Sequence, residues 1–387
     1  MQACLCLNVG SSSLKAAAYP PGRQSRTPAF RASHDASVED CLNVDGIDEA
    51  MPVEGDDYGR TALRLLEIAK TRLNAPVAVV HRVVHGGNIS GAPVEITPEI
   101  VARLEEVTPL APLHQPANLA PVTAISAERP DVRQLACFDT SFHETIPEVA
   151  RRLPLPESAG GGRLRRYGFH GLSHASAARR LAAEGLRRMV VLHLGGGSSV
   201  TAIDEGESID TTMSATPLAG PMMTTRSGSI DPGALIWLLR DGHDLDQLER
   251  MLWSDSGLKG VSGISNDLRD LIGHGSPDAA LAVDMYCADL VRHVGAMAAR
   301  LGGMDGLVFT GGAGAGQPLI RERVAEAFRW SGVVVDPQAN RIIDEQSVSD
   351  TGSRISASES AVPIWVLPVD EETQMAIETE HAREESP

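Results

Sequence analysis

The chain has little lysine, few aromatic residues and no long apolar run. Of its 34 basic residues only Lys15, Lys70 and Lys259 are lysines, and aromatic residues make up 4% of the 387. No stretch of about 18 or more apolar residues occurs, so we expect no membrane-spanning helix. The formal net charge of −17 argues against nucleic acid or an anionic membrane surface as a partner. An anionic substrate would need basic side chains placed locally against this overall charge.

Cysteine is also scarce. The five cysteines, Cys4, Cys6, Cys41, Cys137 and Cys287, are too few and too scattered for a disulfide framework or a zinc site. No basic segment followed by a long apolar one opens the sequence, so we expect a cytoplasmic protein. A length of 387 residues suggests two domains, each large enough to bury a core of its own.

Two common catalytic motifs are missing, and three glycine-rich turns are present. Without G-x-x-x-x-G-K-[ST] the chain is not a P-loop protein, and without G-x-S-x-G an α/β-hydrolase is disfavoured. Residues 190–203 are predicted to form a hairpin with the tip GGGSS; residues 5–19 repeat this pattern, and 307–316 repeat it more loosely. One such turn can simply end a buried strand, but three predict a phosphate chain held by backbone N–H groups from several sides. The repeat also implies two duplicated halves, with the phosphates in a cleft between them.

Hydrophobic periodicity and turn residues predict the remaining elements. We expect 20–60 to be irregular and 210–233 to form a long functional loop. Helices are expected at 58–73, 97–110, 174–184, 232–241, 245–253, 278–301 and 318–330, before Arg129 and from Glu371, and further strands at 77–84, 132–138, 306–310, 333–335 and 364–369.

Several charged and polar residues fall at strand ends or in glycine-rich loops. Two arginines and a histidine there would bind a small carboxylate beside a phosphoryl group, because arginine binds both anions through paired N–H groups. Each arginine alone could instead be a surface ion-pair partner. Asp139 and Glu371, which follow strands, could be turn formers or carboxylates near a divalent cation. The group comprises Arg82, His114, Asp139, His143, His170, His193 and Arg226.

Nine stretches spread over nearly the whole chain form a specific series. They are NVGSSSLK (8–15), HRVVHGG (81–87), APLH (111–114), FDTSFH (138–143), RRYGFHGLSH (165–174), HLGGGSS (193–199), TPLAG with MMTTRSGSIDPG (216–233), FTGGAG (309–314) and PVDEE (368–372). In this order they resemble the acetate kinase family, the acetate and propionate kinases of the sugar kinase/Hsp70/actin superfamily. RYGFHG combined with TRSG-x-IDPG is highly specific for that family.

The resemblance implies an α/β fold of two duplicated ribonuclease H-like domains with a cleft between them. One domain would comprise 1–143 and 373–387, and the other, which binds the nucleotide, 144–372. The implied reaction is reversible phosphoryl transfer from ATP to acetate by direct in-line displacement, giving acetyl phosphate and ADP. It would depend on Mg²⁺, with Mn²⁺ as an alternative metal, and the protein would be a homodimer.

The same resemblance assigns roles to individual residues. Arg82 and Arg226 would position the acetate carboxylate and the phosphoryl oxygens. His170, together with Arg226, would stabilise charge in the transition state, and Asp139 would be the catalytic carboxylate. The magnesium site would include Asn8 and Glu371. The substrate pocket matches Val84, Leu113, His114, Phe169 and Pro217, and the nucleotide and phosphate segments match Ser11, Ser13, Lys15, His193, Leu194, Gly195, Gly196, Gly197, Asp267, Leu268, Arg269, Gly312, Ala313, Gly314, Ala315 and Gly316.

The sequence departs from the family pattern mainly in the nucleotide loops. Gly196 replaces Asn, Ala315 and Gly316 replace Glu and Asn, Thr224 replaces Gly, and Ser229 replaces Asp. One hypothesis is that the phosphoryl donor is bound differently, with weaker ATP affinity or with another donor such as pyrophosphate. The other is neutral drift, in which backbone N–H groups keep the phosphate contacts whatever the side chain.

Two further functions stay open. The chain could phosphorylate propionate or butyrate, although Val84 leaves less room than alanine would and so favours acetate. It could also be a non-catalytic nucleotide or acyl-phosphate sensor that kept the fold. The presence of Arg82, Asp139, His170 and Arg226 argues against a sensor.

Overall fold

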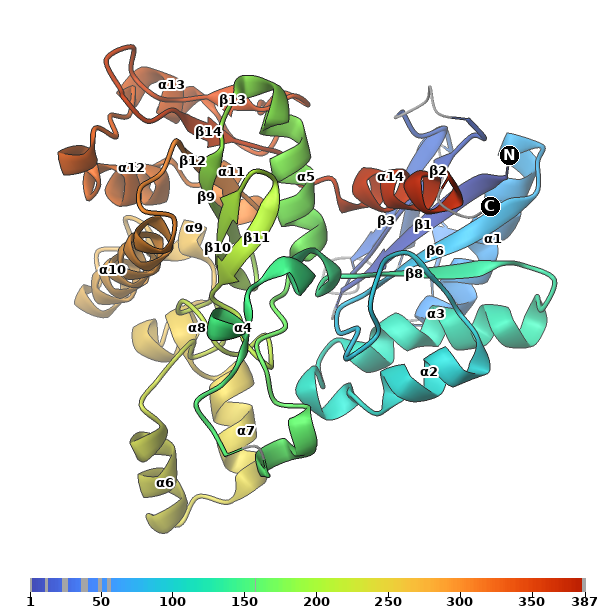
Figure 1. The fold of residues 1–387 in the computed structure, drawn as a ribbon, viewed down its shortest axis with the longest axis horizontal. Helices are drawn as coiled ribbons and strands as arrows, with labels where there is room; N and C mark the ends of the chain where they lie inside the picture. The colour runs from blue at the N-terminus through green and yellow to red at the C-terminus, as the bar shows by residue number, and fades with distance from the viewer. Residues whose placement is uncertain are drawn as a thin grey trace. The chain divides into compact units, whose positions relative to one another are not determined.

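The computed structural model divides into two compact units (Figure 1). The first unit comprises Met1–Phe142 and Asp370–Pro387, and the second comprises His143–Val369. Each has a mixed sheet with its own buried core. The structure describes residues 2–10, 13–22, 27–35, 41–47, 51–53, 57–156 and 158–384.

The described part of the first unit contains an eight-stranded sheet. Its strands are β1 (Ala3–Val9), β2 (Ser13–Tyr19), β3 (Phe30–Asp35), β4 (Cys41–Val44), β5 (Met51–Pro52), β6 (Val77–Val83), β7 (Val94–Glu95) and β8 (Gln134–Phe138). The strand order is β5-β4-β3-β2-β1-β6-β8-β7. β1 pairs antiparallel with β2 and parallel with β6, which in turn pairs parallel with β8.

Helices cover both faces of this sheet (Figure 1). Leu5 and Leu7 of β1 belong to one buried core with Leu65. Successive side chains of a strand point to opposite faces, and Asn8 accordingly points the other way, toward a helix that carries Glu371. The helices are α1 (Tyr58–Leu73), α2 (Pro98–Glu105) and α3 (Gln115–Glu128), and α14 (Glu371–Glu384) on the opposite face.

The second unit repeats this topology. Its strands are β9 (Arg188–Leu194), β10 (Ser198–Asp204), β11 (Glu207–Thr211), β12 (Gly306–Thr310), β13 (Ser353–Arg354) and β14 (Ile364–Val366), in the order β11-β10-β9-β12-β14-β13. β9 pairs antiparallel with β10 and parallel with β12, which pairs parallel with β14. The series β3-β2-β1-β6-β8 therefore corresponds to β11-β10-β9-β12-β14, which confirms the duplication predicted from the two hairpins.

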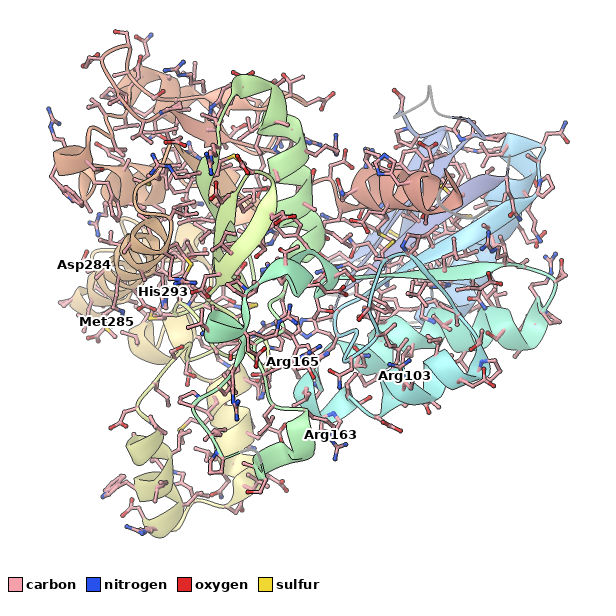
Figure 2. The ribbon with its side chains drawn as sticks, in the orientation of Figure 1. Arg103, Arg163, Arg165, Asp284, Met285 and His293 are labelled. Carbon is pink, nitrogen blue, oxygen red and sulfur yellow. The ribbon has the colours of Figure 1, made fainter. Side chains whose placement is uncertain are left out.

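Two helices of the second unit pack on opposite sides of β9. Leu192 belongs to the core that also contains α10, whereas His193 points to the other face and contacts Ser173 of α5. Asp284 and Met285 lie on the outer side of α10 (Figure 2), where Met285 is exposed. The helices are α4 (Glu148–Arg151), α5 (Gly171–Leu181), α6 (Pro232–Arg240), α7 (Leu245–Ser254), α8 (Gly257–Ser262), α9 (Leu268–Leu271), α10 (Pro277–Arg300), α11 (Gly312–Gly316), α12 (Pro318–Glu326) and α13 (Pro337–Ile342).

Short 3₁₀ turns join several of these elements. They are η1 (Thr108–Leu110), η2 (Ser141–Thr145), η3 (Ala159–Gly162), η4 (Ala182–Glu184) and η5 (Arg329–Ser331). No helix in the described parts of the chain is both long and apolar enough to cross a membrane.

The structure confirms most predicted elements and corrects several. Both hairpins and the helix at 58–73 are confirmed. The prediction that 20–60 is irregular is wrong, because this segment contains β3, β4 and β5. In β3 the buried positions are Phe30, Ala32 and the polar His34, so the alternation of apolar residues was too weak to detect. The predicted strand at 333–335 is also wrong, since only isolated bridges occur there, and α12 ends at Glu326 rather than near 330.

The packing of α14 generates a prediction about pH and stability. Burial raises the pKa of Glu378 to about 7, although hydrogen bonds from Gln374 and Cys137 lower it in part. Between about pH 4.5 and 7 the unfolded carboxyl is ionised while the folded one stays protonated, so the native state loses stability as the pH rises. We expect Glu378→Gln to be more stable than the parent by about 3 kcal/mol at pH 8.

Urea denaturation at pH 4 and pH 8 measures this difference. At pH 4 both states carry the proton on Glu378, so the parent and Glu378→Gln should have nearly equal unfolding free energies. A stabilisation by Glu378→Gln that is the same at both pH values would contradict the buried, protonated carboxyl.

Candidate active site

In the first unit, Arg82 forms the centre of a buried polar cluster. As predicted, Arg82 lies near the end of a strand, here β6, and Asp139 directly follows β8. The Arg82 Nε donates to Asp139 Oδ1 at 2.9 Å and its Nη2 donates to Asp139 Oδ2 at 2.6 Å, a two-point ion pair. Its Nη1 donates to Asn8 Oδ1 at 2.9 Å and lies 3.2 Å from Glu371 Oε2. One guanidinium thus contacts the two predicted metal ligands, Asn8 and Glu371, and also the predicted catalytic carboxylate, Asp139.

Asn8 links the same cluster to the first turn of α14. Its Nδ2 donates to Glu371 Oε2 at 2.8 Å and to Glu372 Oε1 at 2.7 Å. Burial lowers the pKa of Arg82, but the carboxylates of Asp139 and Glu371 outweigh that effect and raise it. Burial also raises the pKa of Glu371, against the opposing effect of Arg82. Arg31 Nη1 also lies 3.7 Å from Glu372 Oε2. Three carboxylates therefore face two guanidinium groups, and the remaining negative charge favours an additional cation.

The side-chain oxygens around Arg82 are of the type that a Mg²⁺ site with few protein ligands would use. Mg²⁺ prefers oxygen ligands and is commonly held by one or two carboxylates together with water and substrate phosphates. Glu371 and Glu372 supply buried carboxylates, and Asp139 and Glu371 both pair with Arg82. No group of three or more His, Cys, Asp or Glu side chains in the described residues is arranged as a complete metal site. The cluster could thus supply Mg²⁺ with one or two carboxylate ligands, and water and substrate would have to supply the rest.

In the second unit, a strained turn presents His170. The non-glycine residue His170 has φ 58°, in the left-handed region, directly before α5. Such backbone is uncommon outside glycine and tends to occur at functional sites. Arg163 and Arg165 precede the turn (Figure 2), and the Arg165 guanidinium lies 4.9 Å above the Tyr167 ring.

His143 supports this turn from the side. Its Nε2 lies 3.0 Å from the carbonyl oxygen of Phe169, which can only accept, so Nε2 carries the proton and donates. The His143 Nδ1 then accepts from the Ser208 hydroxyl at 2.8 Å. A Cβ on Gly168 would lie 2.4 Å from the His143 ring, and Gly168 has φ 76°, so only glycine fits there. His143 thereby fixes the backbone that carries His170.

Arg226 lies in the loop between β11 and α6, which contains no helix or strand among its described residues. Its Nη1 donates to the Pro217 carbonyl oxygen at 3.0 Å, and its guanidinium lies 5.4 Å from the centre of the Trp253 ring. Burial lowers the pKa of Arg226 to about 10, so the side chain stays charged at neutral pH. The loop backbone is held at Thr225 and Ser227 by hydrogen bonds to the end of α7 and the residues after it.

His170 and Arg226 meet above the central glycine hairpin. A Cβ on Gly197 would lie 3.2 Å from Arg226 Nη1 and 3.3 Å from His170 Nε2. The same position would lie 3.3 Å from His170 Cε1. The two side chains therefore converge on one backbone position. An anion bound there could accept hydrogen bonds from both the guanidinium and the imidazole. Of the three predicted anion-binding side chains, the second unit brings these two together.

A pocket of about 590 Å³ in the second unit contains much of the predicted nucleotide site. From the predicted set it includes Gly195, Gly196, Asp267, Leu268, Arg269, Gly312, Ala313 and Gly316. Its wall also includes Thr224, Asn266, Gln317, Asp344, Glu345 and Gln346, which the sequence did not assign to a nucleotide site. The segment 344–346 has no glycine-rich motif, so its place in the pocket wall could not be predicted from the sequence.

Some predicted nucleotide residues lie behind this pocket instead of lining it. Gly314 and Ala315 are buried, and their carbonyl oxygens accept from the buried Arg321. His193 stacks on His170 with ring centres 4.1 Å apart. Leu194 is fully buried in the core of the second unit.

Several of the residues that depart from the family pattern make defined contacts with their surroundings. The Thr224 hydroxyl donates to the Gly196 carbonyl oxygen at 3.0 Å and so braces the hairpin tip. A Cβ on Gly312 would lie 2.5 Å from Glu345 Oε1, and one on Gly316 would lie 3.6 Å from the same atom. The carboxylate of Glu345 thus occupies space beside the third glycine turn.

The remaining predicted residues of the first unit are placed individually. Ser11 lies outside the described residues. Lys15 is exposed on β2, directly opposite Asn8 in the hairpin register, and Ser13 begins the same strand. The backbone N–H of Val84, a predicted residue of the substrate pocket, donates to Asn118 Oδ1 at 2.8 Å. This hydrogen bond fixes the backbone at Val84.

The other substrate-pocket residues differ in exposure. Val84 is buried, Leu113 is 40% exposed and His114 is partly buried. In the second unit Phe169 is buried and Pro217 contributes its carbonyl oxygen to Arg226. Their grouping into one methyl pocket stays a prediction.

Comparison with known proteins gives a consistent family. The profile of the acetokinase family matches residues 3–377. The acetate kinase of Rhodopseudomonas palustris is 40% identical over 400 residues, which cover 96% of each chain. The crystal structure of Porphyromonas gingivalis acetate kinase is 36% identical, with a TM-score of 0.85 over 98% of this chain and 99% of that one. A propionate kinase from Francisella tularensis is 30% identical, also with a TM-score of 0.85 and the same shares covered.

Fold and site together define a carboxylate kinase built from two duplicated actin-like α/β halves. The chain belongs to the acetokinase family.

The close approach at Gly197 generates a prediction about activity. In Gly197→Ala the new Cβ would press on Arg226 Nη1 and His170 Nε2, and both would have to move by a few tenths of an ångström. Because small misplacements of catalytic groups slow reactions steeply, we expect kcat for phosphoryl transfer to fall about tenfold.

Gly295→Ala is the matched control. Gly295 lies within α10, and its Cβ would make only ordinary contacts with the Phe328 ring at 3.9 Å or more. Steady-state kinetics of both variants decide the matter. If Gly197→Ala had the same kcat as Gly295→Ala, the convergence at Gly197 would not matter for the reaction.

Proposed function

We propose that this protein is an acetate kinase that transfers the γ-phosphoryl group of ATP reversibly to acetate. An acetate carboxylate oxygen forms a bond to the γ-phosphorus while the bond to the β,γ-bridging oxygen breaks, which yields acetyl phosphate and ADP. The observation that carries the proposal is the convergence of Arg226 and His170 above Gly197, beside a pocket of about 590 Å³. Family membership and the acetate kinase relatives support the choice of reaction.

The donors at Gly197 would act on the phosphoryl group during transfer. Phosphoryl transfer needs positioning and charge neutralisation more than covalent catalysis. Arg226 Nη1 and His170 Nε2 would donate to the equatorial oxygens, and Arg226 would keep its charge because its pKa lies near 10. Donors fixed in a buried site stabilise developing charge strongly because they need no reorganisation.

The cluster around Arg82 would serve the acyl acceptor and the metal. Arg82 has five N–H groups, and its contacts with Asp139, Asn8 and Glu371 leave the second Nη2 hydrogen for a substrate oxygen. Glu371 and Glu372 would hold Mg²⁺, which when bound supplies charge neutralisation for the phosphate oxygens. Asp139 would act as the carboxylate beside it, kept in place by the two-point pair with Arg82.

We further propose that the two compact units are two functional domains. The unit His143–Val369 would bind the nucleotide, since the 590 Å³ pocket is formed by its residues. The unit that contains Arg82 and α14 would bind the acyl group and the metal. A cytoplasmic location also stays a prediction.

A hydroxamate assay of acyl phosphate formation tests the proposal. Purified protein with Mg²⁺ and hydroxylamine trapping should form acetyl hydroxamate from acetate and ATP. The rates should be lower with propionate, butyrate, GTP or pyrophosphate. A faster rate with pyrophosphate than with ATP would identify another donor, and no acyl phosphate with any pair would indicate a sensor.

Ala313→Trp sharpens the question of the donor. Ala313 is partly exposed and lines the pocket, so an indole there should obstruct the nucleoside and raise the KM for ATP at least tenfold without changing the KM for acetate. Ala280→Trp, on the exposed side of α10, is the control. An unchanged KM for ATP in Ala313→Trp would place the nucleotide elsewhere.

We also propose that the protein is a homodimer that uses the α6 surface. Ile236 is 52% exposed, Trp237 61% and Leu239 45%, all on α6, and Leu245 at the start of α7 is 69% exposed. Exposed apolar clusters with an aromatic residue are typical of protein interfaces. A second copy of this chain is the partner that the family resemblance indicates.

Sedimentation velocity measures this association. The parent should sediment as a dimer, and Trp237→Lys should sediment as a monomer because it places a charge in the apolar cluster. Trp330→Lys, at a residue that is 82% exposed outside α6, should remain dimeric. A dimer that survives Trp237→Lys would assign the interface to another surface.

A further inference from the structure

A buried serine lies between two histidines of the second unit. The Ser199 hydroxyl is 2.9 Å from His170 Nδ1 and 2.8 Å from His174 Nε2. Ser199 and His174 are both fully buried. A hydroxyl has one hydrogen to donate, so when both contacts are hydrogen bonds it donates in one and accepts in the other.

We call the chain of hydrogen bonds from His174 through Ser199 to His170 the Ser199 relay. The surroundings of His174 set its direction. Its Nδ1 is buried and has no hydrogen-bond partner among the described residues. Burial, together with His143 and His193, lowers the pKa of His174 well below its ordinary value, so the ring is neutral and has a single N–H. A buried N–H without an acceptor is rare in folded proteins. The hydrogen therefore lies on Nε2, from which it is donated to the Ser199 oxygen.

The direction carries through to His170. Because Ser199 accepts from His174, its own hydrogen is donated to His170 Nδ1, and the neutral His170 ring must carry its hydrogen on Nε2. That atom is the one that adjoins Gly197 together with Arg226 Nη1. The relay thus turns a hydrogen-bond donor toward the place where the two side chains converge.

The other groups around His170 are compatible with this arrangement. His193, from β9, stacks on the ring, and its Nδ1 contacts the Ser173 hydroxyl. His143 is neutral because burial lowers its pKa to about 4, and its ring lies edge-on to His174 at 5.7 Å. The charged Arg226 approaches Gly197 beside His170 Nε2.

We propose that Ser199 and His174 are positioning residues that hold His170 as the Nε2–H tautomer. In the acetate kinase reaction, on which this inference rests for its catalytic meaning, a neutral His170 would donate from Nε2 to a phosphoryl oxygen. Protonation of His170 Nδ1 would turn two N–H groups toward one serine oxygen, so the relay also opposes the imidazolium form. Neither Ser199 nor His174 touches substrate in this account.

Tautomers are measured directly by long-range ¹⁵N–¹H NMR of histidine-labelled protein, with His170→Gln used to assign the His170 signals. The parent without substrates should show His170 protonated on Nε2. In Ser199→Ala and His174→Phe, an Nδ1–H population should appear, and kcat should fall about tenfold with KM values unchanged. His174→Gln, whose amide can still donate to Ser199, should keep the parent tautomer and most of the kcat.

The spectra need no substrate, so they decide the tautomer even if the protein has no acetate kinase activity. An Nδ1–H tautomer in the parent, or an unchanged His170 spectrum in Ser199→Ala, would overturn the proposal. A fall in kcat in His174→Gln equal to that in Ser199→Ala would also overturn it, because a donor at position 174 would then not be what matters. Ser199→Ala and His174→Gln change few atoms, so they keep the test available if His174→Phe does not fold.

Discussion

The close contact of Arg226 and His170 with the backbone at Gly197 is the constraint that organises the second unit. A side chain at residue 197 would crowd both of these polar groups, and each group is held from behind. Pro217 and Trp253 hold the guanidinium, and a left-handed turn supported by His143 holds the imidazole. Such donors are oriented before any substrate arrives, which is the condition for strong electrostatic stabilisation.

The two units share a topology but differ in the charge that they place at corresponding strand ends. Asn8 and His193 both stand two residues before the first glycine of their hairpin tips. Asn8 bonds to two glutamates of α14, whereas His193 stacks on the histidine that faces Arg226. One half therefore gathers carboxylates that suit a cation, and the other gathers donors that suit an anion. A phosphoryl transfer enzyme needs both.

The departures from the family pattern lie where this structure supplies other contacts. Thr224 bonds to the carbonyl of Gly196, and Glu345 approaches Gly312 and Gly316. These contacts favour neutral drift over a change of donor, because the backbone N–H groups of the glycine turns are retained.

Much of the fold was predictable because it depends on local patterns. The hairpins at β1–β2 and β9–β10 and the helix α1 follow from glycine turns and from helical periodicity over adjacent residues. β3 was missed because the polar His34 occupies a buried position of its inward face, so burial there was decided by neighbouring strands and not by the residue type.

The sequence alone predicted the duplicated fold and the family, and it singled out Arg82, Asp139, His170 and Arg226 as candidate site residues because each stands in a short specific motif. Only the tertiary structure decided which of their atoms face each other. The two-point pair of Arg82 with Asp139 joins residues 57 positions apart, and the relay through Ser199 joins a strand to a turn and a helix. Hydrogen-bond direction depends on which neighbours a buried atom has or lacks, and no linear pattern records that.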